Sequence, residues 1–305
     1  MDESEWTRVM VDLLALALRL EGEGQYNLAK LARATADSLA RRAAYRQARP
    51  PDGLNLAAEV NRVIEDLAGL AVDEAVVAAL RRGAAVLAEG RLPLIDDTPH
   101  PYVCRTCGAM ALGTTTDNCP TCGARPDTFQ WFPPVYWLQA LDPPAAQDRL
   151  RRTPFEVAAL LDGLTEEDMA RRPADGGWSV RHILTHLRDA QDVLEFRLGL
   201  FAQEDNPQLE SKAVFEWATS EAERPPTARE LLATYQATRA RVLETLDALP
   251  PADWWRPGRH QEFGVVTLGQ QVSYFATHEV THLPQLAALR AGLVASMGDQ
   301  TGAQA

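Results

Sequence analysis

Two histidines four residues apart stand near the C-terminus, in the run Thr277-His278-Glu279-Val280-Thr281-His282-Leu283-Pro284-Gln285. In a helix this spacing places both imidazoles on one face, where they can bind one metal ion. Apolar residues recur every three or four positions from 267 to 290, which predicts such a helix with one buried face. The pair therefore supplies half of a metal site.

The letters His-Glu-x-x-His also spell the motif of zinc proteases, in which the glutamate is the general base. Glu279 would be that base, and a third ligand would normally follow downstream. After His282 the chain offers only Asp299 and no Gly-x-x-His continuation, which disfavours a protease. A further alternative is that the two histidines are merely hydrogen-bonded in a helical core. We favour a ligand pair that is completed from another helix.

Candidates for the missing ligand lie upstream. His182 and His186 are one helical turn apart, and the apolar residues Ile183, Leu184 and Leu187 flank them. Spacing alone does not choose between these two histidines.

Four cysteines form a second group, as two Cys-x-x-Cys pairs within nineteen residues: Cys104 with Cys107, and Cys119 with Cys122. A glycine follows each pair, so each can form a tight knuckle whose backbone N–H groups face the thiolates. Two knuckles supply a tetrahedral S4 set for zinc or iron. A disulfide or a thioredoxin-like redox motif is disfavoured, because one Cys-x-x-Cys would serve it and the second would be unexplained.

The composition bounds the class of protein. The 305 residues carry a net charge of −12, which argues against nonspecific binding to nucleic acid or to an anionic membrane. No run of eighteen apolar residues exists and the N-terminus is acidic, so we expect a cytoplasmic protein without a membrane segment. Ala and Leu dominate while β-branched alternation is scarce, which predicts a mainly α fold.

The chain divides into five expected segments. Helical patterns without histidine predict a small bundle over 1–99, and a Pro- and aromatic-rich connector covers 132–152. The cysteine module lies between them at 100–131. Thr153-Pro154 reads as the start of a four-helix bundle over 153–292, and we expect 293–305 to be a flexible tail.

Residues 102–131, which include Cys122-Gly123-Ala124-Arg125-Pro126-Asp127-Thr128-Phe129, resemble the rubredoxin-like module at the C-terminus of rubrerythrins. The run from Glu23 to Ala34 is similar to the second bundle helix of that family, in which a Glu-x-x-His normally follows. Leu39 and Arg42 occupy the corresponding positions. The resemblance implies that residues 1–99 are a degenerate rubrerythrin-like bundle without di-iron ligands.

A second resemblance covers residues 146–292. The run Gly177-Trp178-Ser179, then His186-Leu187-Arg188-Asp189 and Arg197-Leu198, and the run Gly264 to Leu268 with His278 to Gln285, resemble the DinB/YfiT-like metal-binding four-helix bundle. This resemblance implies that His186, His278 and His282 bind a divalent metal: zinc, nickel or iron. His182 is then an extra residue, and His260 lies either in the pocket or in a solvated loop.

Three neutral imidazoles leave a coordination position open, and a coordinated thiol is deprotonated. With the family's activities this predicts a thiol-dependent S-transferase of detoxification or stress response, whose partners are a low-molecular-weight thiol and an electrophilic small molecule. Glu279 could orient a ligand, but no catalytic base is identified. The alternatives are a redox or electron-transfer protein with iron at the cysteines, and a structural or binding protein with zinc there. Broad apolar helix faces also lead us to expect a homodimer.

Overall fold

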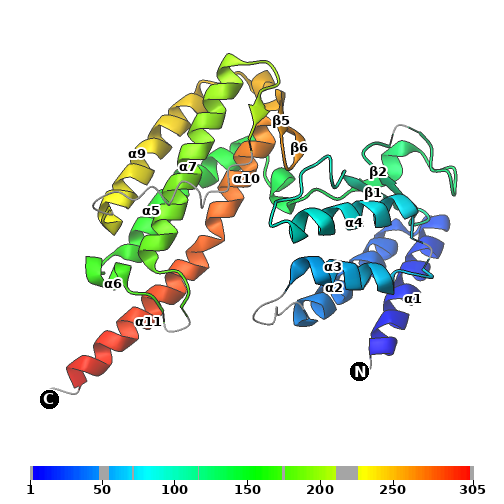
Figure 1. The fold of residues 1–305 in the computed structure, drawn as a ribbon, viewed down its shortest axis with the longest axis horizontal. Coiled ribbons are helices and arrows are strands. Elements are labelled where there is room, and N and C mark those ends of the chain that lie inside the picture. Colours follow the sequence, from blue (N-terminus) through cyan, green and yellow to red (C-terminus); the bar gives the residue numbers. More distant parts are fainter. Residues whose placement is uncertain are drawn as a thin grey trace. The chain divides into compact units, whose positions relative to one another are not determined.

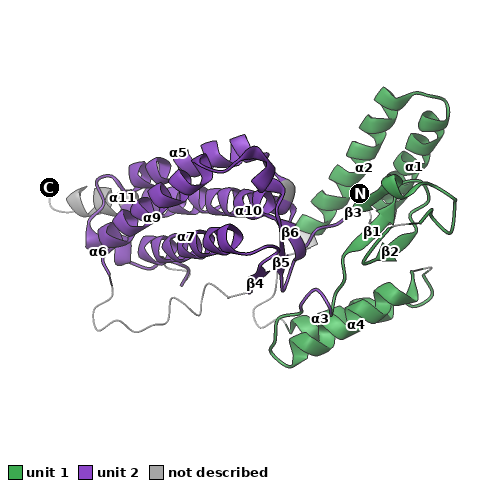
Figure 2. Ribbon diagram, turned by 90° about the horizontal axis from the view of Figure 1, so that it is seen from above, with its two compact units in different colours: residues 1–93, 97–131 green, residues 94–96, 132–305 purple. Residues whose placement is uncertain are grey.

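The computed structural model describes residues 3–47, 55–70, 72–115, 117–173, 176–210 and 226–302. It separates into two compact units, residues 1–93 with 97–131, and residues 94–96 with 132–305 (Figure 2). The main division falls after Trp131. Within the described residues, no helix is both long and apolar enough to span a membrane.

The N-terminal helices pair as two hairpins. Helices α1 (Glu3–Gly22) and α2 (Tyr26–Gln47) pack together, as do α3 (Leu56–Asp66) and α4 (Glu74–Ala88). The seam of the first hairpin contains the small residues Ala17, Ala29 and Ala32, and Arg33 forms a bidentate ion pair with Glu21 across it at 2.6 and 2.7 Å. Asn55 caps α3 through its side chain, as the sequence predicts.

This pairing differs from the single bundle expected over 1–99. In the first hairpin the buried alanines let α1 and α2 pack against each other through small side chains. Several large apolar side chains that a closed bundle would bury stay exposed: Val11, Leu14, Leu18, Leu28 and Leu31. The rubrerythrin-like character of this region therefore remains a prediction.

The cysteine module is a small antiparallel sheet in the order β2 (Met110–Leu112), β1 (Pro101–Cys104), β3 (Phe129–Trp131), with the short 3-10 helix η1 (Pro126–Thr128) before β3. Its two Cys-x-x-Cys turns repeat the same backbone hydrogen bonds, all at 2.8 Å. Cys104 N–H donates to Ala109 O and Gly108 N–H to Cys104 O; the second turn pairs residues 119, 123 and 124 in the same way. Both glycines, at 108 and 123, have positive φ, which explains why each turn ends in glycine.

The connector expected at 132–152 is partly helical. After the 3-10 helix η2 (Tyr136–Gln139), helix α5 (Pro143–Leu161) begins ten residues before Thr153, because Asp142 caps it and two prolines fill its first positions. Pro154 therefore lies inside the helix, where it cannot donate to the carbonyl of Leu150. Arg239 donates to that carbonyl at 2.5 Å, which replaces the missing bond.

The C-terminal unit contains the expected four-helix bundle, formed by α5, α7 (Val180–Gln203), α9 (Ala228–Asp247) and α10 (Leu268–Val280) (Figure 1). Both α5 and α7 pack on α9 and α10, so α5 and α7 lie across the bundle from each other. Asp192 of α7 contacts Thr238 of α9. Three residues further along both helices, Glu195 contacts Arg241, so α7 and α9 run parallel. The buried apolar residues form two clusters, one around the N-terminal half of α7 and one around its C-terminal half.

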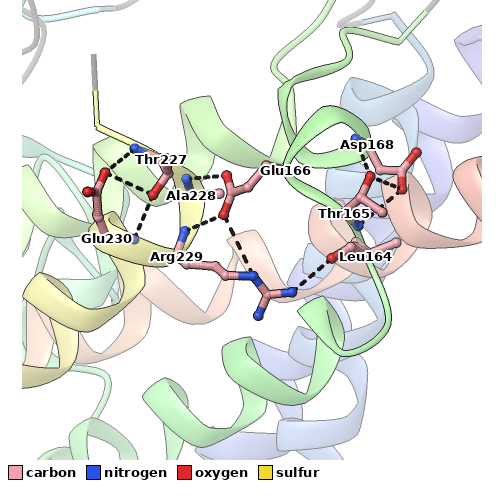
Figure 3. Close-up of polar contacts among 8 residues, drawn as sticks. All are labelled: Leu164, Thr165, Glu166, Asp168, Thr227, Ala228, Arg229 and Glu230. Carbon is pink, nitrogen blue, oxygen red and sulfur yellow. Dashed lines mark hydrogen bonds and ion pairs between the residues drawn. The ribbon is translucent and has the colours of Figure 1, made fainter. Parts of the chain in front are cut away.

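Helix α6 (Glu166–Ala170) is tied to the start of α9 (Figure 3). The carboxylate of Glu166 accepts the backbone N–H groups of Ala228 at 2.8 Å and Arg229 at 3.1 Å, which have no partner within α9 itself. Arg229 donates back to Leu164 O at 3.1 Å. These bonds fix the segment from which the loop toward α7 departs.

The C-terminal unit also contains a second small sheet, which the sequence does not predict. After the 3-10 helix η3 (Pro251–Trp255), strands β5 (Pro257–His260) and β6 (Gly264–Thr267) pair antiparallel, and β4 (Gln208–Leu209) adds to β5 in parallel. Gly258 permits this packing, because a Cβ there would lie 2.7 Å from the ring of Phe201. Strands of two to four residues are too short to show an alternation of apolar and polar residues in the sequence.

Helix α11 (His282–Gly302) packs on α5 and α7 and continues through the tail that the sequence leaves flexible. No proline follows Pro284, so nothing in residues 293–302 forbids a helical backbone.

Candidate functional site

Three histidines converge where α7, α10 and α11 meet. His186 comes from the second turn of α7, His278 from the end of α10 and His282 from the start of α11. Their ring centroids lie 4.8 to 5.1 Å apart, and one ligand nitrogen from each lies within 4.8 Å of the others. The Nε2 atoms of His186 and His278 are 3.3 Å apart. Zn–N bonds of about 2.0–2.1 Å at tetrahedral angles require an N···N separation of about 3.3–3.4 Å, so this pair has ligand spacing.

The helix between His278 and His282 is interrupted, although the sequence predicts one continuous helix. Pro284 cannot donate to the carbonyl of Val280, and its ring clashes with that carbonyl in a regular helix. Helix α10 therefore ends at Val280, and Thr281 donates instead to His278 O through its N–H at 3.1 Å and its hydroxyl at 2.6 Å. The two imidazoles stay close across the break.

Two imidazoles of the triad, those of His186 and His278, are neutral at ordinary pH, as metal ligands must be. Burial and the neighbouring His282 lower the pKa of His186 to about 4, and burial and both neighbouring imidazoles lower that of His278 to about 3. His282 Nδ1 lies 2.9 Å from Gln285 Oε1, which can only accept, so the proton resides on Nδ1 and the lone pair on Nε2. That Nε2 atom is buried without a hydrogen-bond partner among the described residues. A buried lone pair of this kind fits a cation.

Aromatic side chains surround the triad. The ring of Trp178 lies 5.2 Å from that of His186, and Tyr274 stacks on His278 at 5.8 Å. Trp137, from the connector, lies 5.7 Å from His278. A pocket of about 930 Å³ opens beside the triad and includes His282, Gln285 and Trp178 in its wall. The sequence singles out Trp178 only as part of a motif and gives no indication of Trp137, whose role depends on the path of the connector.

Glu279 does not face the triad, contrary to its expected role in orienting a ligand. It is 4% exposed and forms a bidentate ion pair with Arg239 of α9, at 2.5 and 3.1 Å, while the hydroxyl of Tyr235 donates to it at 2.8 Å. One residue along a helix is a rotation of about 100°, so the neighbour of a ligand histidine points elsewhere. This geometry rules out the protease interpretation, because the would-be base is held in the core. Asp299 lies in a part of α11 whose side chains are not described.

The two other candidate histidines have structural roles. His182 belongs to the capping box of α7, with Nδ1 2.6 Å from Ser179 Oγ, and it is not part of the triad. His260 is buried on the ring of Phe263, and its Nε2 lies 2.9 Å from Arg197 Nη2. Burial and the nearby Arg197 charge lower the pKa of His260 to about 3. The solvated-loop alternative for His260 is therefore wrong.

The four cysteines also converge. Cys104 Sγ lies 3.8 Å from Cys122 Sγ, and Cys107 Sγ lies 3.6 Å from Cys119 Sγ. Zn–S bonds of about 2.3 Å in a tetrahedron give an S···S edge of about 3.8 Å, so the spacing fits a metal. Burial opposes ionisation of Cys104, but backbone N–H groups of Cys107 and Thr106 and the neighbouring thiols lower its pKa to about 6. Both the distances and the backbone donors suit a bound cation.

Comparison with known proteins finds relatives of the C-terminal half of the chain. Residues 149–286 match the DinB superfamily. A protein of Oceanobacillus iheyensis with the name "Putative metal-dependent hydrolase" is 29% identical over 126 residues, which are 41% of this chain and 73% of that protein. A protein of Geobacillus kaustophilus with the same name is 29% identical over 143 residues, covering 46% and 80%. The solved structure of YfiT from Bacillus subtilis is 21% identical, covers 51% of this chain and 87% of its own, and has a TM-score of 0.43. Residues 149–286 thus form a DinB-like four-helix bundle with three converging histidines.

Proposed function

We propose that the C-terminal bundle is a metal-dependent enzyme that activates a low-molecular-weight thiol for transfer to an electrophilic small molecule. The observation that carries this proposal is the triad itself. Three imidazoles, two with strongly lowered pKa values, converge beside a pocket of about 930 Å³. His186, His278 and His282 would hold a divalent ion, zinc or nickel before iron, and leave a coordination position open. Such an ion lowers the pKa of a thiol, so that its thiolate is available at neutral pH.

The surrounding residues favour thiol chemistry over hydrolysis. Hydrolysis usually employs a positioned carboxylate or imidazole to take a proton from water. Here the carboxylate of Glu279 is paired with Arg239 and is not available as a base. The side chains described above as contacting the triad are aromatic rings and the amide of Gln285. The ordinary pKa of a thiol is about 8.5, against about 15.7 for water, so a metal ion needs to lower it much less and no base is required. The names of the relatives favour a hydrolase, which is the second candidate, with water in place of the thiol.

The test starts from metal content. Wild type and His282→Ala are loaded with zinc or nickel, and bound metal is measured by plasma mass spectrometry. Each is then assayed with several thiols against 1-chloro-2,4-dinitrobenzene, and with p-nitrophenyl acetate without thiol. Thiol conjugation that requires both metal and His282 supports the transferase. Ester cleavage without thiol supports the hydrolase, and no metal-dependent turnover in either assay refutes an enzyme of these kinds.

For the cysteines we propose a zinc module that stabilises the N-terminal unit, in the manner of the rubredoxin-like fold. The alternative is a redox-active iron centre that transfers electrons in a stress response. An Fe(Cys)4 centre absorbs visible light through thiolate-to-iron charge transfer, whereas zinc is colourless. A red protein with about one iron per chain would contradict the zinc proposal.

A further inference from the structure

The pocket beside His282 has walls of contrasting chemistry. It is lined by residues 171–173 and 177–178, by the first turn of α7 and by one face of α11. Its apolar surface comes from a set of described residues on all three elements: Pro173, Trp178, Val180, Ile183, Ala288, Leu289 and Leu293. At about 930 Å³ it falls within the range of about 300–1,000 Å³ that is usual for small-molecule sites.

The charged groups of this pocket have one sign. Arg171 and Arg172 line it, and among the described lining residues none is acidic. In a chain with a net charge of −12 this is a local reversal. Cationic groups set against low-dielectric walls concentrate the field on an incoming anion.

Arg172 forms no ion pair with a carboxylate among the described residues. Its Nη2 lies 3.1 Å from Nε2 of His182. The imidazole of His182 carries no negative charge in either protonation state, so it does not compensate the guanidinium. Arg171 is partly compensated, since it lies 3.4 Å from Asp168, whose other oxygen binds Thr165.

Arg172 and the metal ligands are close enough to share one ligand. His182 and His186 are four residues apart, about 6 Å along the axis of α7. A molecule with one end on Arg172 can therefore lie along Ile183 and Leu289 and bring its other end to His282, which lines the same pocket.

We propose that this pocket binds an amphipathic organic acid, an apolar chain or ring system that ends in a carboxylate. Arg172 is the main anchor of the carboxylate, and Arg171 assists it. The apolar body packs on Trp178 and the exposed face of α11. That this acid is a substrate of the histidine site rests on the proposed function, whereas its binding does not.

The experiment uses the full chain in metal-free and metal-loaded forms. Octanoate, octan-1-ol and octylammonium are titrated in competition with the fluorescent anion 1-anilinonaphthalene-8-sulfonate. A hydrogen bond to a charged group contributes about 1.5–3 kcal/mol, so we expect octanoate to bind at least about tenfold more tightly than octanol. Arg172→Gln should remove this preference. Arg259→Gln, which removes an exposed arginine of the same unit outside the pocket, should leave it unchanged.

A second variant tests the location. Ala288→Trp fills the pocket from α11 and should weaken all three ligands together, with a circular dichroism spectrum like that of wild type. Equal affinity for octanoate and octanol in wild type, an unchanged preference in Arg172→Gln, or undiminished binding in Ala288→Trp would each overturn the proposal. Arg172-dependent binding in metal-free protein without turnover after metal loading would leave this inference standing and refute the proposed function instead.

Discussion

Replacement of Glu279 by glutamine separates a structural role from a catalytic one. Arg239, the ion-pair partner of Glu279, is 2% exposed. It also donates to Gln191 Oε1 at 2.7 Å and to Leu150 O at 2.5 Å, and the variant retains both acceptors. In Glu279→Gln one carbonyl oxygen can still accept from Arg239, but the buried guanidinium loses its counter-charge. Removing one partner of a buried ion pair costs about 3–5 kcal/mol, and the remaining acceptors place our expectation at the lower end, about 3 kcal/mol.

The assay is urea unfolding of the metal-free protein, followed by tryptophan fluorescence, with metal content and turnover measured on the folded variant. Because Glu279 faces away from the triad, and because the glutamine carbonyl can still accept a hydrogen bond from Arg239 and keep the end of α10 on α9, Glu279→Gln should bind the same amount of metal as wild type. The double variant Glu279→Leu with Arg239→Met should recover most of the lost stability, since no unpaired charge remains. Near-normal stability of Glu279→Gln combined with lost turnover would refute this reasoning and restore Glu279 as a catalytic group.

Other substitutions test the fold and the site. His282→Ala should lose the metal at the histidines and keep the metal at the cysteines, as measured by plasma mass spectrometry. Gly258→Ala should destabilise the protein by about 1–3 kcal/mol in urea unfolding, because its Cβ would lie 2.7 Å from the ring of Phe201; an unchanged midpoint would contradict the close packing. Glu166→Ala should cost about 1 kcal/mol, the usual value of a lost N-cap, because the start of α9 loses its acceptor. Burial lowers the pKa of His260 to about 3, below the ordinary value of about 6.5. The unfolded chain therefore binds a proton more readily than the folded protein, so the free energy of unfolding is highest above pH 6.5 and falls as the pH falls toward 3. Between pH 7 and pH 5 this loss is about 2 kcal/mol, and His260→Gln should make the stability profile less steep by that amount, while the contribution of His186 and His278 remains.

The sequence was sufficient for features that depend on local patterns. Periodic apolar residues predict the C-terminal helices, the cap of α7 follows from Ser179, and the paired Cys-x-x-Cys turns predict the clustering of their thiols. The DinB-like character of residues 149–286 is likewise visible in the motifs around His186 and His278.

The features that escaped prediction depend on partners far along the chain. Thr153-Pro154 reads as a helix start, because a proline within a helix normally leaves a carbonyl without a donor. Arg239, 89 residues away from Leu150, supplies that donor. The same arginine explains why Glu279, which lies between two histidines of the triad in the sequence, belongs to the core.

A different local interaction positions each histidine of the triad, and none of the three interactions requires a bound metal. The cap at Ser179 fixes where α7 begins and so places His186 in its second turn. The ion pair between Glu279 and Arg239 holds the end of α10 against α9 and thereby holds the adjacent His278. Pro284 ends α10 at Val280, and Gln285 then orients the ring of His282 through Nδ1. Because these interactions operate in the folded protein before any ion binds, the site is preorganised, and a metal need not supply the free energy that orders its ligands.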